Sequence, residues 1–466
     1  MRSHGFRSDA LLVFAMLWHG CSAGNTAMHE EPASTSGGAG ATAEATGGTP
    51  ATKPAAAGTG GTATTPIAGT SARAGADANA AGSVSKPTAG TGAAAGSGGA
   101  PGSAGQPAAA GTAGAPQAGS MAPPATSPGG HACHSTADWT PAASDIWVAP
   151  TGSDTNPGTE ASPKQTLTAA VAAWSAGKTI WVMPGDYAYS SAIALSTKAS
   201  ADAPLRISGI STGAMPVFDF SSEPRSTGNG GQRGIELSGS HVHVRYLELK
   251  KAADNCVYVT GTDNTLEWLS VHECQDTGVQ VSNGAASNKV LNVDSYLNTD
   301  PSGENADGFA PKLSIGQNNY FCGTRAYHNA DDGYDCWASG DSSPVKFEYC
   351  WAFGQPGPTA TANGDGNGFK LGSPAGRASG GNAPHELIDC YAFHNRSAGY
   401  TANGNSSGKI TCENCGEWGN GVAWSSGTGG KDPQHTGDIT NLGVTVEQAI
   451  NAPRDQWGDL PDISKL

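Results

Sequence analysis

The chain has 466 residues, of which 25 are Lys or Arg and 40 are Asp or Glu, so its formal net charge at pH 7 is -15. The five basic and five acidic residues before position 131 cancel, so the net charge belongs to residues 131–466. An acidic surface argues against a nucleic-acid partner, and it suits a polyanionic ligand only if bound cations invert the local field.

The first 21 residues have the pattern of an export signal. Arg2 and Arg7 form a basic start, residues 10–18 are largely apolar, and a small residue precedes Cys21. The apolar run is too short to span a bilayer as a helix. Its order resembles a bacterial lipoprotein signal. We therefore predict a signal peptide over residues 1–21 with Cys21 as the lipidated residue. The alternative is ordinary signal cleavage and release.

Residues 22–130 form a segment of biased composition. From Ser34 to Gly130 the chain is almost entirely Ala, Gly, Thr, Ser and Pro, without an aromatic residue. Such a stretch cannot bury enough apolar surface to offset the entropy lost on ordering. We predict a disordered linker over residues 22–130, followed by one folded domain over residues 131–466.

The folded domain begins with a strand, a loop, a helix and a second strand over residues 145–190, which contain IWVAPTGSD, TLTAAVAAW and TIWVMPGDY. The helix near Leu167 to Trp174 is apolar enough to cover the open end of a solenoid, which would otherwise expose unpaired strand edges. We predict that this helix is the cap.

From about residue 240 onward the sequence repeats a short apolar strand, a polar turn, and then Gly followed by an apolar residue. An irregular repeat of this length with alternating strands predicts a parallel β-helix, an all-β solenoid in which equivalent residues of successive coils form columns. The alternative, a β-sandwich, predicts no columns. The repeats begin at Gly278, Gly308, Gly333, Gly368, Gly399 and Gly421.

The columns predict which side chains share a face, because residues of a strand alternate in direction. The residues after the first five glycines are expected inside, and the next residues along each strand are expected outside. A third column predicts an asparagine ladder at one turn. The inward column is Val279, Phe309, Tyr334, Phe369 and Tyr400; the outward column is Gln280, Ala310, Asp335, Lys370 and Thr401; the ladder is Asn298, Asn329, Asn395 and Asn420.

Ten cysteines in an exported chain would ordinarily indicate disulfides. The alignment of the coils instead places Cys350, Cys390 and Cys415 in one inward column, where we expect them to act as small core hydrophobes. Cys256 and Cys274 are candidates for a disulfide.

The same alignment brings four carboxylates together. Asp307 and Asp332 precede their glycines by one residue, and Asp331 and Asp335 flank the second of these turns. Four like charges at one turn repel one another and favour a cation, and Ca²⁺ takes six to eight oxygen ligands in flexible geometry. The alternative is that these residues satisfy backbone groups at the turns.

Lys370 occupies the outward column one coil beyond Asp335, so we expect it beside the metal without ligating it. A bound cation would lower the pKa of the amine and let it accept a proton. The alternative is a surface ion pair between Lys370 and Asp335. Beside calcium, a neutral lysine could abstract the C5 proton of a 4-linked uronide and so start a β-elimination.

Three motifs, ENADGFAPK, NADDGYD and NGDGNGFKLG, resemble in order the active-site motifs of polysaccharide lyase family 9, which contains pectate lyases and exopolygalacturonate lyases. The resemblance covers roughly residues 145–425 and implies a right-handed parallel β-helix that cleaves pectate. It also implies that Asp307, Asp331, Asp332 and Asp335 bind Ca²⁺ and that Lys370 is the base.

Two departures from that pattern affect the cleft. Pro311 removes one backbone amide from the strand ladder, and residues 356–362 form a Gly, Pro and Thr-rich insertion. Lys312 and Arg396 are candidates for binding uronate carboxylates, with simple surface charge as the alternative.

Three other functions remain open at this point. One is a lyase acting on another uronate polymer such as alginate. The second is a glycoside hydrolase, which needs two carboxylates at a defined separation and no calcium, and Lys370 argues against it. The third is a non-catalytic, calcium-stabilised carbohydrate-binding or adhesin module, in which Lys370 would be replaceable. For each of these functions we expect a monomer that is secreted or anchored at the cell surface, for example as an outer-membrane lipoprotein.

Overall fold

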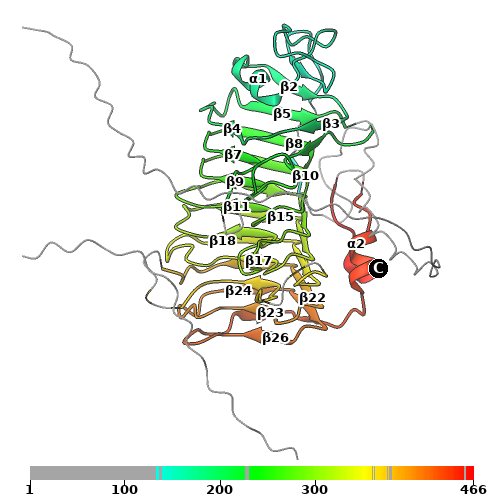
Figure 1. Ribbon diagram of the computed structural model, residues 1–466. Coiled ribbons are helices and arrows are strands. Elements are labelled where there is room, and N and C mark those ends of the chain that lie inside the picture. Colours follow the sequence, from blue (N-terminus) through cyan, green and yellow to red (C-terminus); the bar gives the residue numbers. More distant parts are fainter. Residues whose placement is uncertain are drawn as a thin grey trace, which may run out of the picture. The chain divides into compact units, whose positions relative to one another are not determined.

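The computed structural model describes residues 133–135, 139–211, 213–225, 230–358, 360, 363–374, 376, 380–455 and 458–466. The predicted signal, Cys21 and the predicted linker lie outside these residues. The regular elements of the described part are almost all short parallel strands, stacked coil upon coil (Figure 1), which confirms the predicted β-helix. No helix among the described residues has the length and apolar character needed to cross a bilayer.

One face of the β-helix is a nine-stranded parallel sheet whose strands follow one another in chain order. It comprises β4 (Ile193–Leu195), β7 (Ile235–Leu237), β9 (Val257–Val259), β11 (Val279–Val281), β14 (Phe309–Pro311), β17 (Tyr334–Asp335), β20 (Phe369–Lys370), β23 (Ala398–Thr401) and β26 (Val422–Ser425).

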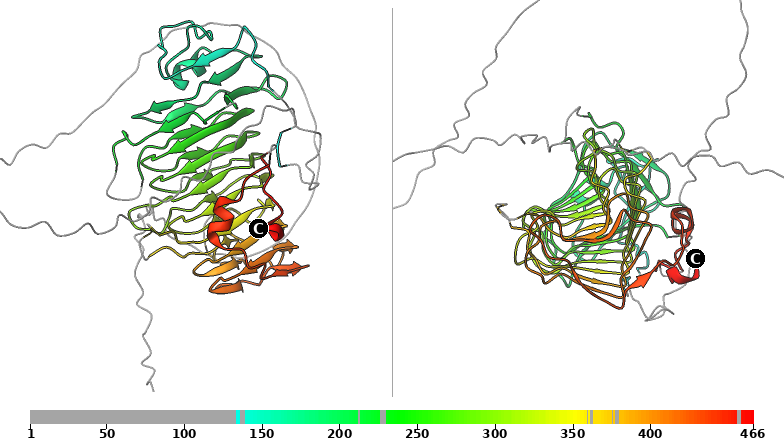
Figure 2. Two further views of the ribbon diagram at one scale, coloured as in Figure 1. Left: turned by 90° about the vertical axis from the view of Figure 1, so that its right-hand side faces the viewer. Right: turned by 90° about the horizontal axis from the view of Figure 1, so that it is seen from below.

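The remaining strands form a second sheet with two series that meet in the long strands β8 (Val242–Lys250) and β10 (Thr265–His272). Each long strand bends at a residue with positive φ, Tyr246 in β8 and Trp268 in β10. The coils therefore have three faces, and successive coils lie over one another in the end-on view of Figure 2.

The first series comprises β1 (Ile146–Val148), β2 (Thr179–Val182), β5 (Leu205–Gly209), β12 (Lys289–Leu291), β15 (Asn319–Cys322), β18 (Val345–Glu348), β21 (Glu386–Ile388), β24 (Thr411–Glu413) and β27 (Gln434–Thr436). The second comprises β3 (Asp186–Ala188), β6 (Val217–Asp219), β13 (Asp294–Tyr296), β16 (Arg325–Tyr327), β19 (Trp351–Phe353), β22 (Tyr391–Phe393), β25 (Gly416–Trp418) and β28 (Ile439–Thr440).

The solenoid begins earlier than the sequence repeat suggested. Strand β1 already pairs with β2, and β4 pairs with β7, so the coils start at Ile146 rather than near residue 240. Helix α1 (Leu167–Ala172) lies at this first end of the stack, as predicted, with Leu167 and Ala170 buried against the core (Figure 1). It ends before Trp174.

The inward column is confirmed. The rings of Phe309 and Tyr334 stack with centroids 5.1 Å apart, Tyr334 and Phe369 at 4.4 Å, and Phe369 and Tyr400 at 5.2 Å. The column ends with Trp424, which stacks on Tyr400. The predicted alignment of the last repeat was wrong by two residues, because β26 pairs Trp424, not Val422, with Tyr400. A shift of two keeps the same side chains inward.

The asparagine ladder is also present, with one glutamine inserted. Asn298 donates to Asn329 at 2.8 Å and Asn395 donates to Asn420 at 3.0 Å. Between them, Gln355 accepts from the backbone amide of Asn329 through Oε1 and donates its own backbone amide to Asn395 Oδ1. A second ladder, which the repeat did not indicate, runs through Asn264, Asn288 and Asn319. These amides satisfy the backbone groups of the turns.

Replacing Asn395 by Ala should lower the free energy of unfolding by about 2 kcal/mol, because buried partners lose their hydrogen bonds. The side-chain Nδ2 of Asn395 donates to the backbone carbonyl of Ala352 at 2.9 Å, and its Oδ1 accepts from the backbone amide of Gln355 at 3.2 Å. Urea unfolding of the two proteins measures the difference. The exposed Asn451, at the end of α2 (Val446–Asn451), provides the control, since its replacement by Ala should change stability little. Equal effects of the two substitutions would contradict the role of the ladder.

Three disulfides join described cysteines: Cys133 with Cys322, Cys256 with Cys274, and Cys412 with Cys415. The candidate pair Cys256 and Cys274 is thus confirmed. The expectation for Cys415 as a free core residue was wrong, because a left-handed turn at Asn414 brings it to Cys412 of the same coil. Cys350 and Cys390 are free and fully buried, as expected.

The C-terminal segment folds back along the second series of strands. Helix α2 starts with a capping box at Thr445 and packs, together with the 3₁₀ turn Ile463–Lys465, on a column of aromatic rings. The column includes Tyr327, Phe353 and Phe393. This segment leaves the nine-stranded sheet uncovered (Figure 1).

Candidate active site

The candidate residues lie at the beginning of strands in the nine-stranded sheet. Each turn ends in a glycine that allows close packing of adjacent coils: a Cβ on Gly333 would lie 2.6 Å from the carbonyl oxygen of Gly368. The strand register places Asp335 beside Lys370 in the outward column. The repeat therefore fixes the side of the sheet on which these two candidate residues lie.

The residues that precede these glycines form a chain of hydrogen bonds from coil to coil. The amide of Asp332 donates to Asp307 Oδ1 at 3.2 Å, and the amide of Asn367 donates to Asp332 Oδ1 at 2.7 Å. The amide of Ala398 in turn donates to Asn367 Oδ1 at 3.1 Å. One oxygen of each aspartate thus accepts from a backbone amide of the next turn, as in the alternative that these residues satisfy backbone groups. This hydrogen bond also holds the second oxygen of the carboxylate in place.

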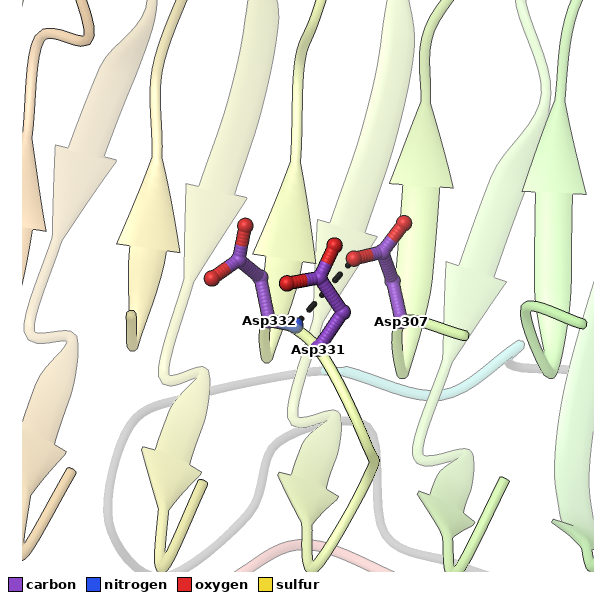
Figure 3. A group of neighbouring side chains, drawn as sticks. All are labelled: Asp307, Asp331 and Asp332. Carbon is purple, nitrogen blue, oxygen red and sulfur yellow. Dashed lines mark hydrogen bonds between the residues drawn. The ribbon is translucent and has the colours of Figure 1, made fainter. Parts of the chain in front are cut away.

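Three of the four predicted metal ligands form one group, shown in Figure 3. One carboxylate oxygen from each of Asp307, Asp331 and Asp332 lies within 4.8 Å of the others, and all three side chains are buried. Asp335 is outside this group. Its Oδ1 accepts from the amide of Trp337 at 2.9 Å, and its Oδ2 lies 3.5 Å from Lys312 Nζ.

Burial and mutual repulsion raise the pKa of the three carboxyl groups. The pKa of Asp307 rises to about 8, mainly through burial, with Asp335 and Asp332 adding to the shift against Lys312. Burial together with Asp332 and Asp307 raises the pKa of Asp331 to about 10. For Asp332, burial outweighs the neighbouring Lys370 and raises the pKa as well. The group therefore favours either protons or a cation.

The donor set fits a hard divalent cation. All candidate ligands are carboxylate oxygens, and Asp332 Oδ2 is buried without a well-aligned hydrogen-bond donor, although Lys370 Nζ lies 3.1 Å away. A buried carboxylate oxygen without a hydrogen bond is costly unless a cation compensates it. Carboxylate oxygens are hard ligands of the kind that Ca²⁺ uses, and further oxygens would have to complete its six to eight ligands.

For a divalent cation such as Ca²⁺ bound in this group, the raised pKa values predict an affinity that increases with pH. Asp307, with a pKa of about 8, carries a proton in much of the metal-free protein at pH 6, and a cation must displace it. We expect affinity to rise by up to about tenfold per pH unit between pH 6 and pH 8 for each proton released. Calorimetric titration at these pH values measures it, and an affinity independent of pH would contradict the shifts.

Lys370 lies against the cluster of three aspartates. Its Nζ is 3.1 Å from Asp332 Oδ2 and 2.9 Å from Asp365 Oδ2, and the side chain is nearly buried. Burial favours the neutral amine, but the surrounding carboxylates, Asp332 first, outweigh it and hold the pKa of Lys370 well above its usual range. The lowered pKa predicted for a base therefore depends on a cation that neutralises these carboxylates. The alternative ion pair with Asp335 is replaced by pairs with Asp332 and Asp365.

Lys312 and Arg396, the two predicted uronate-binding residues, occupy different positions. Lys312 is buried, with Nζ 2.8 Å from Asp307 Oδ2. Arg396 donates from Nη2 to the carbonyl of Gly364, next to Asp365, and lines a pocket of about 610 Å³. Lys312 thus contacts one of the three clustered aspartates, whereas Arg396 is bonded to the turn that contains Asp365.

Asp365 is a site residue that the column alignment missed. It pairs with Lys370, and its amide donates to Asp331 Oδ1 at 2.5 Å. The residue lies within the motif NGDGNGFKLG, but three positions before its glycine, whereas Asp307 and Asp332 precede theirs by one. The aspartate in that motif was the available signal. Thr277, which donates to Asp307 Oδ2 at 3.2 Å, was not predicted either, although it precedes its glycine by one residue, as Asp307 and Asp332 do.

The chain is similar in sequence to known proteins. Residues 146–434 match the family model described as Pel9A-like, right handed beta helix region. A pectate lyase L of Paenibacillus polymyxa (strain SC2) is 38% identical over 253 residues, which cover 51% of this chain and 56% of the relative. A pectate lyase L of Dickeya chrysanthemi is 35% identical over 237 residues, covering 48% and 55%. The chain spans about half the length of the curated relatives it matches.

Solved structures show the same architecture. The crystal structure of pectate lyase Pel9A superimposes with a TM-score of 0.57 at 28% sequence identity, covering 68% of this chain and 88% of the other. A structure named rhamnogalacturonan lyase superimposes with a TM-score of 0.55 at 21% identity, covering 68% and 95%, and this similarity concerns the fold alone.

Proposed function

Because the chain belongs to the family of Pel9A-like right-handed β-helix proteins, we propose that it is a calcium-dependent pectate lyase that cleaves 4-linked polygalacturonate by β-elimination. The observation that carries the proposal is the position of Lys370 Nζ, 3.1 Å from Asp332 in a buried group of three carboxylates. The relatives named pectate lyase support the choice of substrate.

Asp307, Asp331 and Asp332 would hold the calcium ion, with Asp335 as the proposed fourth ligand on the adjoining strand. When bound, calcium would neutralise the uronate carboxylate and stabilise the enolate-like charge that develops as the C5 proton leaves. A divalent ion would also offset the local electrostatic repulsion between an acidic protein and an acidic polymer.

Lys370 is proposed as the base that takes the C5 proton through Nζ. It stands on β20, a short strand paired on both sides, so its backbone is rigidly held, and Asp332 and Asp365 orient its amine. Loss of the C5 proton forms the C4 to C5 double bond as the C4 oxygen departs, and water supplies the proton for that oxygen. Lys312 and Arg396 are proposed to bind uronate carboxylates.

Incubation of the purified protein with polygalacturonate and calcium tests the proposal. β-Elimination creates an unsaturated uronide that absorbs in the ultraviolet, whereas hydrolysis creates none. We expect absorbance to increase with polygalacturonate, to stop after calcium is chelated, and to resume when calcium is restored. Reducing ends without absorbance would indicate a hydrolase, and product from alginate alone would indicate another uronate as substrate.

The proposal includes the parts of the chain outside the described residues. Residues 1–21 would direct export, Cys21 would carry the lipid anchor, residues 22–130 would be the linker, and residues 131–466 would be a monomeric lyase domain at the cell surface. Mass measurement of the mature amino terminus distinguishes a lipidated Cys21 from simple cleavage and secretion.

A further inference from the structure

Two lysines from neighbouring parts of the sheet, Lys312 directly after β14 and Lys370 in β20, pair with different carboxylate oxygens of the site. Lys370 pairs with Asp332 and Asp365, whereas Lys312 lies 2.8 Å from Asp307 Oδ2 and 3.5 Å from Asp335 Oδ2. The side chains of both lysines are 11% exposed. Lys312 therefore bridges two of the four proposed calcium ligands.

The position of Lys312 accounts for the separation of Asp335 from the other three aspartates. Asp307 is shared: its Oδ2 accepts from Lys312 while its Oδ1 caps Asp332. Asp335 is paired through its Oδ2 with Lys312 Nζ, and it does not belong to the group of the other three aspartates. An ammonium thus occupies the position between Asp307 and Asp335, which in a four-carboxylate site would face the metal.

The backbone of Lys312 is fixed, so a change in its pairing requires only side-chain rotation. Its amide donates to the carbonyl of Val281 at 3.0 Å, and its carbonyl accepts from Ser282 Oγ at 2.7 Å. A flexible chain of four carbons separates this anchored backbone from the ammonium, so the charge can move while the backbone stays in place.

Charge balance favours such a movement when a divalent ion binds. A doubly charged ion ligated by Asp307 would lie within a few ångströms of the Lys312 ammonium in a buried site, where like charges repel strongly. We propose that Lys312 is the internal counter-ion of the metal-free site, and that a divalent cation displaces it from Asp307 and Asp335. This inference rests on the proposed calcium site. The released ammonium would remain on the outward side of the sheet, available to the uronate carboxylate.

Calorimetric titration of calcium, without polysaccharide, tests this exchange in the full chain. We expect Lys312→Met to bind calcium roughly tenfold more tightly than the unmodified protein, because the competing charge is gone. Lys312→Arg retains the charge and should have the original affinity. Lys346→Met removes an exposed lysine paired with Glu348 and should also leave the affinity unchanged. Equal or weaker binding by Lys312→Met would overturn the exchange and indicate a purely structural ion pair.

A second measurement uses the unmodified protein and does not depend on the folding of a variant. Acetylation by a lysine-specific reagent, followed by mass spectrometry, should modify Lys312 several-fold faster with saturating calcium than without it. An unchanged rate would refute displacement. If the unmodified protein binds no calcium, the proposed cofactor and this inference both fail; if it binds calcium and Lys312→Met has the same affinity, only the inference fails.

Discussion

Replacement of Lys370 by Met should reduce the rate of unsaturated-product formation by about 10²–10⁴-fold, the range expected when a general base is removed. The amine lies beside the cluster of aspartates and pairs with Asp332 and Asp365. These pairs hold it where the C5 proton of the proposed substrate would lie. Ultraviolet absorbance with polygalacturonate and calcium measures the rate.

Two further variants separate proton transfer from charge. Lys370→Arg keeps a positive charge near both aspartates but remains protonated at any accessible pH, so it should be as inactive as Lys370→Met. Lys346→Met, which removes an exposed lysine, should retain full activity. Circular dichroism should show a folded β-helix for all three proteins. Substantial activity in Lys370→Arg would exclude Lys370 as the base and leave it a positioning residue.

Replacement of Asp332 by Asn should weaken calcium binding by about 100-fold or more and reduce activity at low calcium to a similar degree. Asp332 is fully buried, lies in the group with Asp307 and Asp331, and has one oxygen without a well-aligned hydrogen bond. Removing one of few charged ligands from a buried site costs several kcal/mol of interaction with a divalent ion. Calorimetric titration measures the affinity.

The asparagine variant is designed to keep the fold. The other oxygen of Asp332 accepts from the amide of Asn367 at 2.7 Å, and the carbonyl oxygen of Asn can accept the same bond. The metal-free variant should therefore show a cooperative thermal transition. Asp202→Asn, at an exposed turn, provides the control and should leave affinity and activity unchanged. Unchanged calcium affinity in Asp332→Asn would remove the aspartate group as the metal site.

The columns of the β-helix could be predicted because the physical rule behind them is local. Side chains alternate along a strand, and equivalent residues of stacked coils face the same way. Phe309, Tyr334 and Phe369 therefore had to share the core, and Asp335 and Lys370 had to share the outer face. The exact register was less certain, since a shift of two residues leaves the same pattern, and the last coil differs in this way.

The cysteines show where the column argument stops. Cys415 belongs to the inward column, yet its partner is Cys412 of the same coil, reached through a left-handed turn at Asn414. Cys133 and Cys322 are separated by 189 residues, and no column relates them. Pairings of this kind depend on how individual turns and chain ends fold back on the solenoid.

The sequence by itself determined the architecture, the face that carries the polar residues, and the convergence of Asp307, Asp331 and Asp332, because all three follow from periodicity. Only the tertiary structure decided how the charges pair. It placed Lys312 between Asp307 and Asp335 and brought Asp365 to Lys370 across a loop. Contacts at 3 Å depend on side-chain rotation and on turns of unequal length, neither of which a repeat of residue types specifies.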